Sequence, residues 1–285
     1  MILISKKLGS WRGIVRYLAL IIINIVISLI SSTCFAVDFP YRDKYPELNI
    51  IELVDLKSAY DKGDLVVVDL RSELEYETIQ IKGAIHLSYG HAKFNALLAK
   101  IAEQNPNKKI AVYDNGVDCI KSYKAAEDAL YGMIPNVYVF DAGIATWAQA
   151  YPSATLLLGN ELTPSKAQII SVEKTSNSHL DFDTFIQQAG SKDAVVIDTR
   201  DPIQRTQKLP GLENAMLIPI DKLVKNIIKK GHMKNKQLYI FDQVGRQVKW
   251  LMYYLVDNGY TNFYFLDGGA TAVLKEQVYR VSSYQ

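Results

Sequence analysis

The chain has 285 residues, of which 49% are hydrophobic and 22% are charged, and its formal net charge is +2. This composition is that of a globular protein and argues against a disordered chain. Four basic residues lie before the first acidic residue, Asp38; they are Lys6, Lys7, Arg12 and Arg16. Without the first 36 residues the chain therefore carries a small net negative charge. This charge balance does not indicate a nucleic-acid-binding protein, and the sequence has no basic stripe interleaved with aromatic residues. We therefore exclude nucleic acid as a partner.

The first 36 residues have the organisation of a secretory signal. A basic region that ends at Arg16 is followed by the apolar run Tyr17–Ile30 and by small residues up to Ala36. We expect cleavage after Ala36, which would leave a periplasmic or otherwise exported protein. Two alternatives stay open: an uncleaved anchor, because Ile14–Ala36 is just long enough to span a bilayer, and a lipid-anchored Cys34. A membrane partner is expected only if this segment is uncleaved.

The rest of the chain contains an internal repeat. Residues 64–87 and 193–220 each open with a short β-branched run that ends in Asp-x-Arg. Two further pairs follow in the same order: KKIAVYDNG matches KQLYIFDQVG, and NVYVFDAGIATW matches NFYFLDGGATAV. The spacing between matched positions is nearly constant, which indicates a duplication. We therefore predict two homologous domains, residues 37–152 and 172–285, joined by a connector at 153–171.

Within each repeat, short apolar runs alternate with segments of helical periodicity. VVVD, IAVYD and VYVFD are continuous apolar runs, as expected of parallel strands that are covered on both faces. LKSAYDKG, KFNALLAKIAEQ and IKSYKAAEDALYG have the spacing of helices. The sequence thus predicts an α/β fold in which each domain is a parallel sheet flanked by helices.

On these motifs each repeat resembles a rhodanese-like domain, and the chain resembles a tandem rhodanese-like protein over about residues 50–152 and 172–274. The resemblance implies sulfur transfer, in which a loop cysteine takes sulfane sulfur from a donor, holds it as a persulfide and passes it to a thiol acceptor. Donor and acceptor are small molecules or proteins, and no cofactor or metal is implied. Backbone amides and a helix N-terminus around the sulfur would lower the pKa of the thiol.

The usual family pattern has its cysteine directly after a strand, where this chain has Asp114 and Asp242. The second loop, within Phe241–Trp250, contains no cysteine, so we expect the second domain to be non-catalytic. A carboxylate at Asp242 would act there as an internal anion in the amide cradle. The first loop is longer and carries Cys119, the only cysteine beyond the signal segment, which therefore has no partner for an internal disulfide.

Cys119 is the predicted catalytic residue, the nucleophile that bears the persulfide. It lies near the start of a predicted helix, where its thiolate would be stabilised. The residues expected to bind the donor and shape the cradle are Asn115, Gly116, Lys121 and Ser122.

The alternative function comes from another class: a binding or scaffold protein of the cell envelope in which both sites are inactive. It draws support from Asp114 and Asp118, whose charges would oppose formation of a thiolate at Cys119. The sequence leaves the two hypotheses open, because they differ in the geometry around the sulfur of Cys119, which the sequence does not give.

Other residues are expected to be structural. Arg71 and Arg200 of the Asp-x-Arg motifs should hold neighbouring loops, with Glu75 or Glu77 as the carboxylate partner of Arg71. His86 and His91 lack a clear third ligand and make a weak metal signal, so no metal site is predicted. The loop glycines should relieve backbone strain; they are Gly116 and Gly245.

Overall fold

The computed structural model describes residues 38–163, 178–207 and 209–282, and side chains up to 275. The described residues from Pro40 onward belong to one compact unit. The predicted signal segment and residues 164–171 of the predicted connector lie outside the described residues. Among the helices that are described, none is long and apolar enough to cross a membrane.

The first domain is built on a parallel sheet with strand order β3-β1-β4-β5. Every pairing within it is parallel, and a parallel bridge from Ile50 to Val139 extends its far edge. The three apolar runs that were predicted as strands are confirmed. The strands are β1 (Leu65–Asp69), β3 (Ile85–His86), β4 (Lys109–Tyr113) and β5 (Val137–Phe140).

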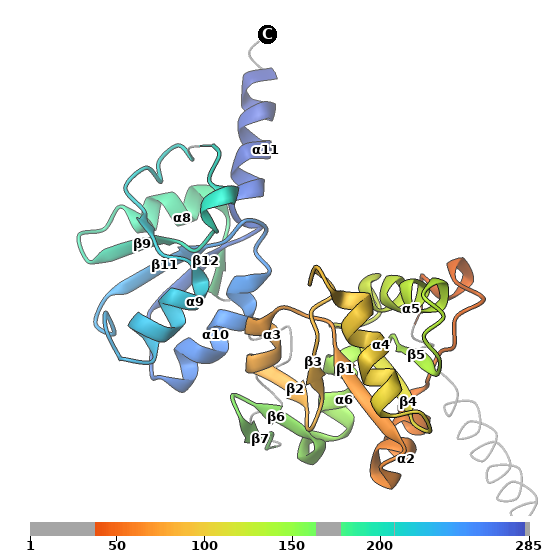
Figure 1. The fold of residues 1–285 in the computed structure, drawn as a ribbon. Helices are drawn as coiled ribbons and strands as arrows, with labels where there is room; N and C mark the ends of the chain where they lie inside the picture. Colours follow the sequence, from red (N-terminus) through yellow and green to blue (C-terminus); the bar gives the residue numbers. More distant parts are fainter. Residues whose placement is uncertain (1–37, 164–177, 208, 283–285) are drawn as a thin grey trace, which may run out of the picture. The chain divides into compact units, whose positions relative to one another are not determined.

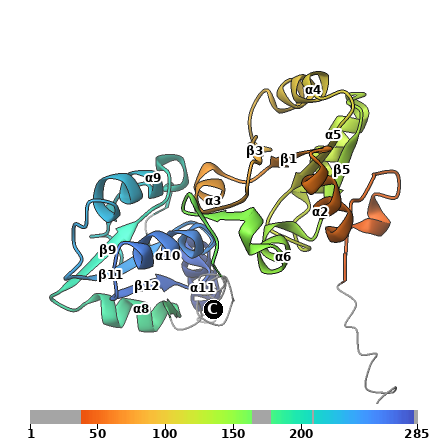
Figure 2. The ribbon, with the colours of Figure 1, turned by 90° about the horizontal axis from the view of Figure 1, so that it is seen from below.

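Helices cover both faces of this sheet, as Figures 1 and 2 show. Alternate side chains of β1 point to opposite faces: Val67 packs in the cluster that contains Trp147, and Val68 in the cluster that contains Leu98. Burial on both faces explains why these strands are apolar throughout. The helices on the Trp147 side are α2 (Leu53–Lys62) and α6 (Gly143–Ala150), and those on the Leu98 side are α4 (Phe94–Gln104) and α5 (Lys121–Tyr131).

The second domain repeats this topology, with strand order β10-β9-β11-β12-β8 and parallel pairing throughout. Strand β8 takes the place that Ile50 has in the first domain. Its strands are β8 (His179–Leu180), β9 (Ala194–Asp198), β10 (Met216–Leu217), β11 (Gln237–Phe241) and β12 (Phe263–Leu266). The flanking helices are α8 (Phe182–Ala189) and α11 (Gly269–Ser282) on one face, with α9 (Ile220–Leu223) and α10 (Gln247–Asp257) on the other.

A small antiparallel sheet in the order β2-β6-β7 lies beside the first domain's main sheet. Strand β2 (Ile79–Ile81) follows the short helix α3 (Glu73–Thr78) and pairs with β6 (Thr155–Leu157), which pairs in turn with β7 (Asn160–Glu161). Residues 155–161 were predicted to be part of the connector, but they belong to this sheet. Leu157 of β6 and Leu162, which directly follows β7, are buried in the first domain's core and hold the segment there.

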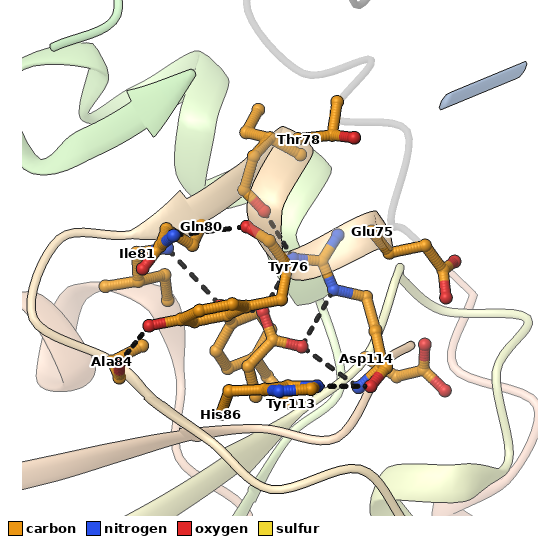
Figure 3. A network of polar contacts seen from close by, with 12 residues as sticks. Glu75, Tyr76, Thr78, Gln80, Ile81, Ala84, His86, Tyr113 and Asp114 are labelled. Atoms are coloured by element: carbon orange, nitrogen blue, oxygen red, sulfur yellow. Dashed lines mark hydrogen bonds and ion pairs between the residues drawn. The ribbon is translucent and has the colours of Figure 1, made fainter. Parts of the chain in front are cut away.

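A buried ion pair closes the carboxyl end of β1 (Figure 3). Asp69 and Arg71 are fully buried, with Nε and NH2 of the guanidinium donating to the two carboxylate oxygens at 2.9 and 2.6 Å. The Tyr113 hydroxyl donates to the same carboxylate at 2.5 Å, and Arg71 also donates to the Ile79 carbonyl. The structural role is confirmed, but the expected partner is wrong: Arg71 pairs with Asp69 within its own motif rather than with Glu75 or Glu77.

The second domain carries the same pair. Arg200 donates from Nε and NH2 to Asp198 at 3.0 and 2.8 Å, and both side chains are buried. Two charges removed from water require each other, because either one alone would keep the full penalty of its lost hydration.

We predict that Arg71→Ala lowers the free energy of unfolding by about 3–5 kcal/mol, since Asp69 would be left charged and buried without its partner. Lys82→Ala is the control, because Lys82 pairs with Glu161 at an exposed site and surface pairs contribute little. Urea denaturation followed by circular dichroism measures both. Equal effects of the two substitutions would contradict the structural role assigned to Arg71.

Candidate functional site

The loop that follows β4 rests on the start of α6. Gly143 has φ +68°, and a Cβ at this position would lie 2.5 Å from the amide nitrogen of Gly116. A glycine is required there by both the backbone angle and the close approach. Gly116 itself is not among the glycines with positive φ, so the expectation that it relieves strain is wrong, whereas Gly245 of the second loop has φ +73°.

Cys119 is half-buried in this loop, and its amide donates to the Gly116 carbonyl at 2.9 Å. Burial raises the pKa of the thiol above its ordinary value, and the charge of Asp114 raises it further. Hydrogen bonds from the amides of Asn115 and Gly116 and the charge of Lys121 act in the opposite direction. Burial and the Asp114 carboxylate outweigh these effects, so the pKa of the thiol lies above its ordinary value.

Asp114 occupies the position directly after β4 and is 1% exposed. Its Oδ1 accepts one hydrogen bond, from the Asn115 amide at 2.7 Å. Its Oδ2 is buried without a hydrogen bond, and the nearest cation, the Lys121 ammonium, lies 3.7 Å away. Burial raises the pKa of this carboxyl, although the Lys121 charge and the Asn115 amide oppose the shift.

A second set of polar contacts ties the loop to α3. The Asn115 side chain donates to Glu75 at 2.8 Å, and Ser72 donates to the same carboxylate through its amide and its hydroxyl. Burial opposes the charge of Glu75, yet these hydrogen bonds hold its pKa below the usual value. Glu75 and Asp114 are both labelled in Figure 3, and the charge of Glu75 acts to raise the pKa of Asp114. The sequence analysis missed Ser72 and Glu75 as loop supports, although Ser-x-x-Glu is a capping-box signal.

The loop borders a cavity of about 510 Å³. Of the predicted site residues, Asn115, Cys119 and Lys121 line it. Gly116 and Ser122 do not; Gly116 is seated against Gly143, and Ser122 is 1% exposed. The second domain contributes Arg246 and Trp250, among others, to the lining.

The second domain's loop is closed around its own carboxylate. Asp242 is 1% exposed. Its Oδ1 accepts from the amides of Val244, at 2.8 Å, and Gly245. Its Oδ2 accepts from the amides of Gln247 and Val248, at 2.5 and 3.1 Å, in the first turn of α10. Four amides and a helix N-terminus converge on this side chain as they would on a bound anion, which matches the expected internal anion.

The difference between the two loops follows from their lengths. Helix α10 begins at Gln247, five residues after Asp242, whereas α5 begins at Lys121, seven residues after Asp114. The shorter loop brings the helix amides to the carboxylate. The longer one leaves Asp114 with a single amide and holds Cys119 near the helix start instead.

His86, one of the two histidines considered as metal ligands, makes structural contacts. His86 contacts the Arg71 carbonyl through Nε2 at 2.9 Å and stacks on Tyr76. Within the described part of the chain no group of three or more His, Cys, Asp or Glu side chains is arranged to hold a metal ion.

Comparison with known families decides the assignment. A family model described as "Rhodanese-like domain" matches residues 52–150 and 181–276. The chain belongs to the rhodanese-like domain family. This confirms the tandem repeat and the fold class, while the predicted boundaries at 37, 152 and 172 stay predictions. No curated protein matches the chain.

This rhodanese-like chain is also similar, at low identity, to several solved structures. A thiosulfate sulfurtransferase from Pseudomonas aeruginosa is 18% identical, covering 81% of this chain and 45% of its own, with a TM-score of 0.35. The BH2092 protein from Bacillus halodurans is 20% identical, covering 48% of this chain and 95% of its own, with a TM-score of 0.35. YnjE is 14% identical, covering 86% and 68%, with a TM-score of 0.30.

We predict that the Cys119 thiol titrates above an ordinary cysteine and is alkylated slowly at neutral pH. Asp114→Asn should lower the pKa of the thiol and speed alkylation, because it removes the adjacent charge and keeps the side chain's size. The measurement is the pH dependence of the iodoacetamide reaction rate. An unchanged or higher pKa in Asp114→Asn would contradict the electrostatic role of Asp114.

We also predict that Asp242→Cys in a Cys119→Ser background creates a thiol with a pKa below about 7.5, because four amides would surround the new sulfur. Its thiolate absorbance at varied pH measures the value. Gly269→Ala in the same protein is the control: a Cβ there would lie 2.5 Å from the Asp242 carbonyl and distort the loop, so the low pKa should be lost. A thiol that titrates like Cys119 would show that the cradle does not stabilise a sulfur anion.

Proposed function

We propose that this protein is an exported rhodanese-like sulfur carrier or sulfurtransferase in which Cys119 of the first domain bears the persulfide. The observation that carries the proposal is the position of Cys119 at the cavity, where the backbone of Asn115 and Gly116 and the charge of Lys121 act to lower the pKa of its thiol. Support for export comes only from the sequence of residues 1–36. The second domain bears no sulfur, since Asp242 fills its cradle.

The proposed chemistry is a transfer of sulfane sulfur in two steps. The Cys119 thiolate attacks the outer sulfur of a donor such as thiosulfate; the donor's S–S bond breaks, sulfite leaves with the electron pair, and Cys119 becomes a persulfide. An acceptor thiolate then attacks the outer sulfur of the persulfide, and the electron pair of the broken bond returns to Cys119 Sγ. The amides of Asn115 and Gly116 stabilise the sulfur anion in each step.

A second candidate is a binding or scaffold protein of the cell envelope. It is favoured by one observation in each domain: the Asp242 carboxylate occupies the second cradle, and Asp114 together with burial raises the pKa of the Cys119 thiol in the first. Under this function the persulfide would not form, and both loops would serve the fold.

We predict that the reduced protein gains the mass of one sulfur atom when it is incubated with thiosulfate or, more readily, with a polysulfide, because polysulfide donors are the more reactive. The gain should disappear on addition of cyanide, which removes sulfane sulfur, and in Cys119→Ser. Intact-protein mass spectrometry is the measurement.

Asp242→Asn is the matched variant for the second domain and should load sulfur like the wild-type protein, because Asp242 takes no part in the transfer. No mass gain with either donor, on a thiol shown to be reduced, would overturn the sulfur carrier in favour of the binding protein. A gain that persists in Cys119→Ser would also overturn it.

A further inference from the structure

The carboxylate of Asp114 has an oxygen that nothing in the loop satisfies. Asp114 lines the cavity beside Cys119, and its Oδ2 is buried without a donor. The Lys121 ammonium, 3.7 Å away, is beyond hydrogen-bonding distance. Buried acceptors are almost always paired in folded proteins, so an orphaned one next to the reacting sulfur points to a ligand that brings its own donor.

The charges around Asp114 define that ligand further. Glu75 and Arg71 act on Asp114 from α3 and from the end of β1, but each is already held, Glu75 by Asn115 and Arg71 by Asp69. Lys121 is the cation next to Asp114 and is half-exposed at the cavity. Arg246 adds a second cation to the lining. A negative group beside a positive one suits a ligand whose head group carries an ammonium beside a carboxylate.

Inorganic thiosulfate matches these features less well and is expected to be a slower donor. It is a dianion that has no hydrogen-bond donor, and it would place acceptors and negative charge against the Asp114 carboxylate. The exposed Asp118 adds another carboxylate to the same lining. Like charges brought together in a partly desolvated site are unfavourable.

We propose that the sulfur donor is a low-molecular-weight persulfide with an α-ammonium group beside an α-carboxylate, of which cysteine persulfide is the smallest, and that Asp114 binds the ammonium. This substrate class rests on the proposed function. Lys121 binds the carboxylate of the donor, and the outer sulfur of the donor lies at Cys119. Asp114 is thus a specificity-determining residue at the position where the family pattern has its cysteine.

The transfer balances without any further reagent. The Cys119 thiolate attacks the outer sulfur of the donor, the donor's S–S bond breaks, and the electron pair leaves on the cysteine sulfur. That thiolate takes up the proton that Cys119 released. Cys119 thiol and cysteine persulfide thus become Cys119 persulfide and cysteine.

The first test measures recognition without transfer. In the Cys119→Ser protein, S-methyl-L-cysteine should bind about 10-fold or more tightly than N-acetyl-S-methyl-L-cysteine, which lacks the ammonium, because a hydrogen bond between charged groups is lost. NMR titration gives both dissociation constants. Asp114→Asn in the same background should abolish the preference, whereas Asp118→Asn, which removes a charge from the lining but leaves the buried oxygen in place, should retain it.

Equal affinity for the two ligands would overturn the proposal, as would a preference that survives Asp114→Asn or disappears in Asp118→Asn. The second test compares sulfur loading of the wild-type protein by cysteine persulfide and by N-acetylcysteine persulfide, with the former expected to be faster. Equal loading rates would overturn the substrate class and leave the carrier function intact. Ammonium recognition without any loading of Cys119 would overturn the carrier function instead.

Discussion

The buried pair of Asp69 and Arg71 is the interaction on which the candidate site depends. The Arg71 guanidinium donates to the Asp69 carboxylate at the end of β1 and to the Ile79 carbonyl at the start of β2. It also donates, at 3.4 Å, to the Asn115 side chain in the loop that carries Cys119. Because both charges are fully removed from water, the geometry of the pair is tightly constrained. Whatever shifts Arg71 therefore shifts the loop that carries Cys119.

The two domains show how one fold with one buried pair supports different loops. In the second domain the Asp242 carboxylate satisfies four amides and so completes an anion site from within the chain. In the first domain the longer loop leaves Asp114 with one amide, and with an oxygen that has an ion pair to Lys121 at 3.7 Å but no hydrogen bond. A carboxylate after the strand is thus compatible with a closed loop or with an open one, and the distance along the chain to the next helix decides between them.

The pKa of the Cys119 thiol is set by opposing effects of its surroundings. Amide donors and Lys121 favour the thiolate, whereas burial and Asp114 oppose it, and the balance raises the pKa of the thiol. A ligand that neutralises Asp114 would shift this balance toward the thiolate. In the proposed function, recognition of the donor and activation of Cys119 would be linked through the Asp114 carboxylate.

The sequence by itself determined the architecture of this protein. Apolar runs such as IAVYD, the twice-repeated Asp-x-Arg motif and the order of the elements were sufficient to predict the duplicated α/β fold, because burial on both sides of a parallel sheet demands continuous apolar strands. The absence of a cysteine from the second loop is likewise a property of the sequence alone. The role of Asp242 followed from its position after β11.

The surroundings of Cys119 were decided only by the tertiary structure. Asn115 and Lys121 line the cavity with Cys119, whereas Gly116 and Ser122 do not. Glu75 supports the loop from a helix forty residues away along the chain. Neither spacing nor composition shows how deeply a side chain is buried or which carboxylate faces it. The pKa of Cys119 and the missing hydrogen bond at the Asp114 carboxylate depend on both. Burial and facing charge are set in turn by how the loop packs against Gly143, α3 and α5.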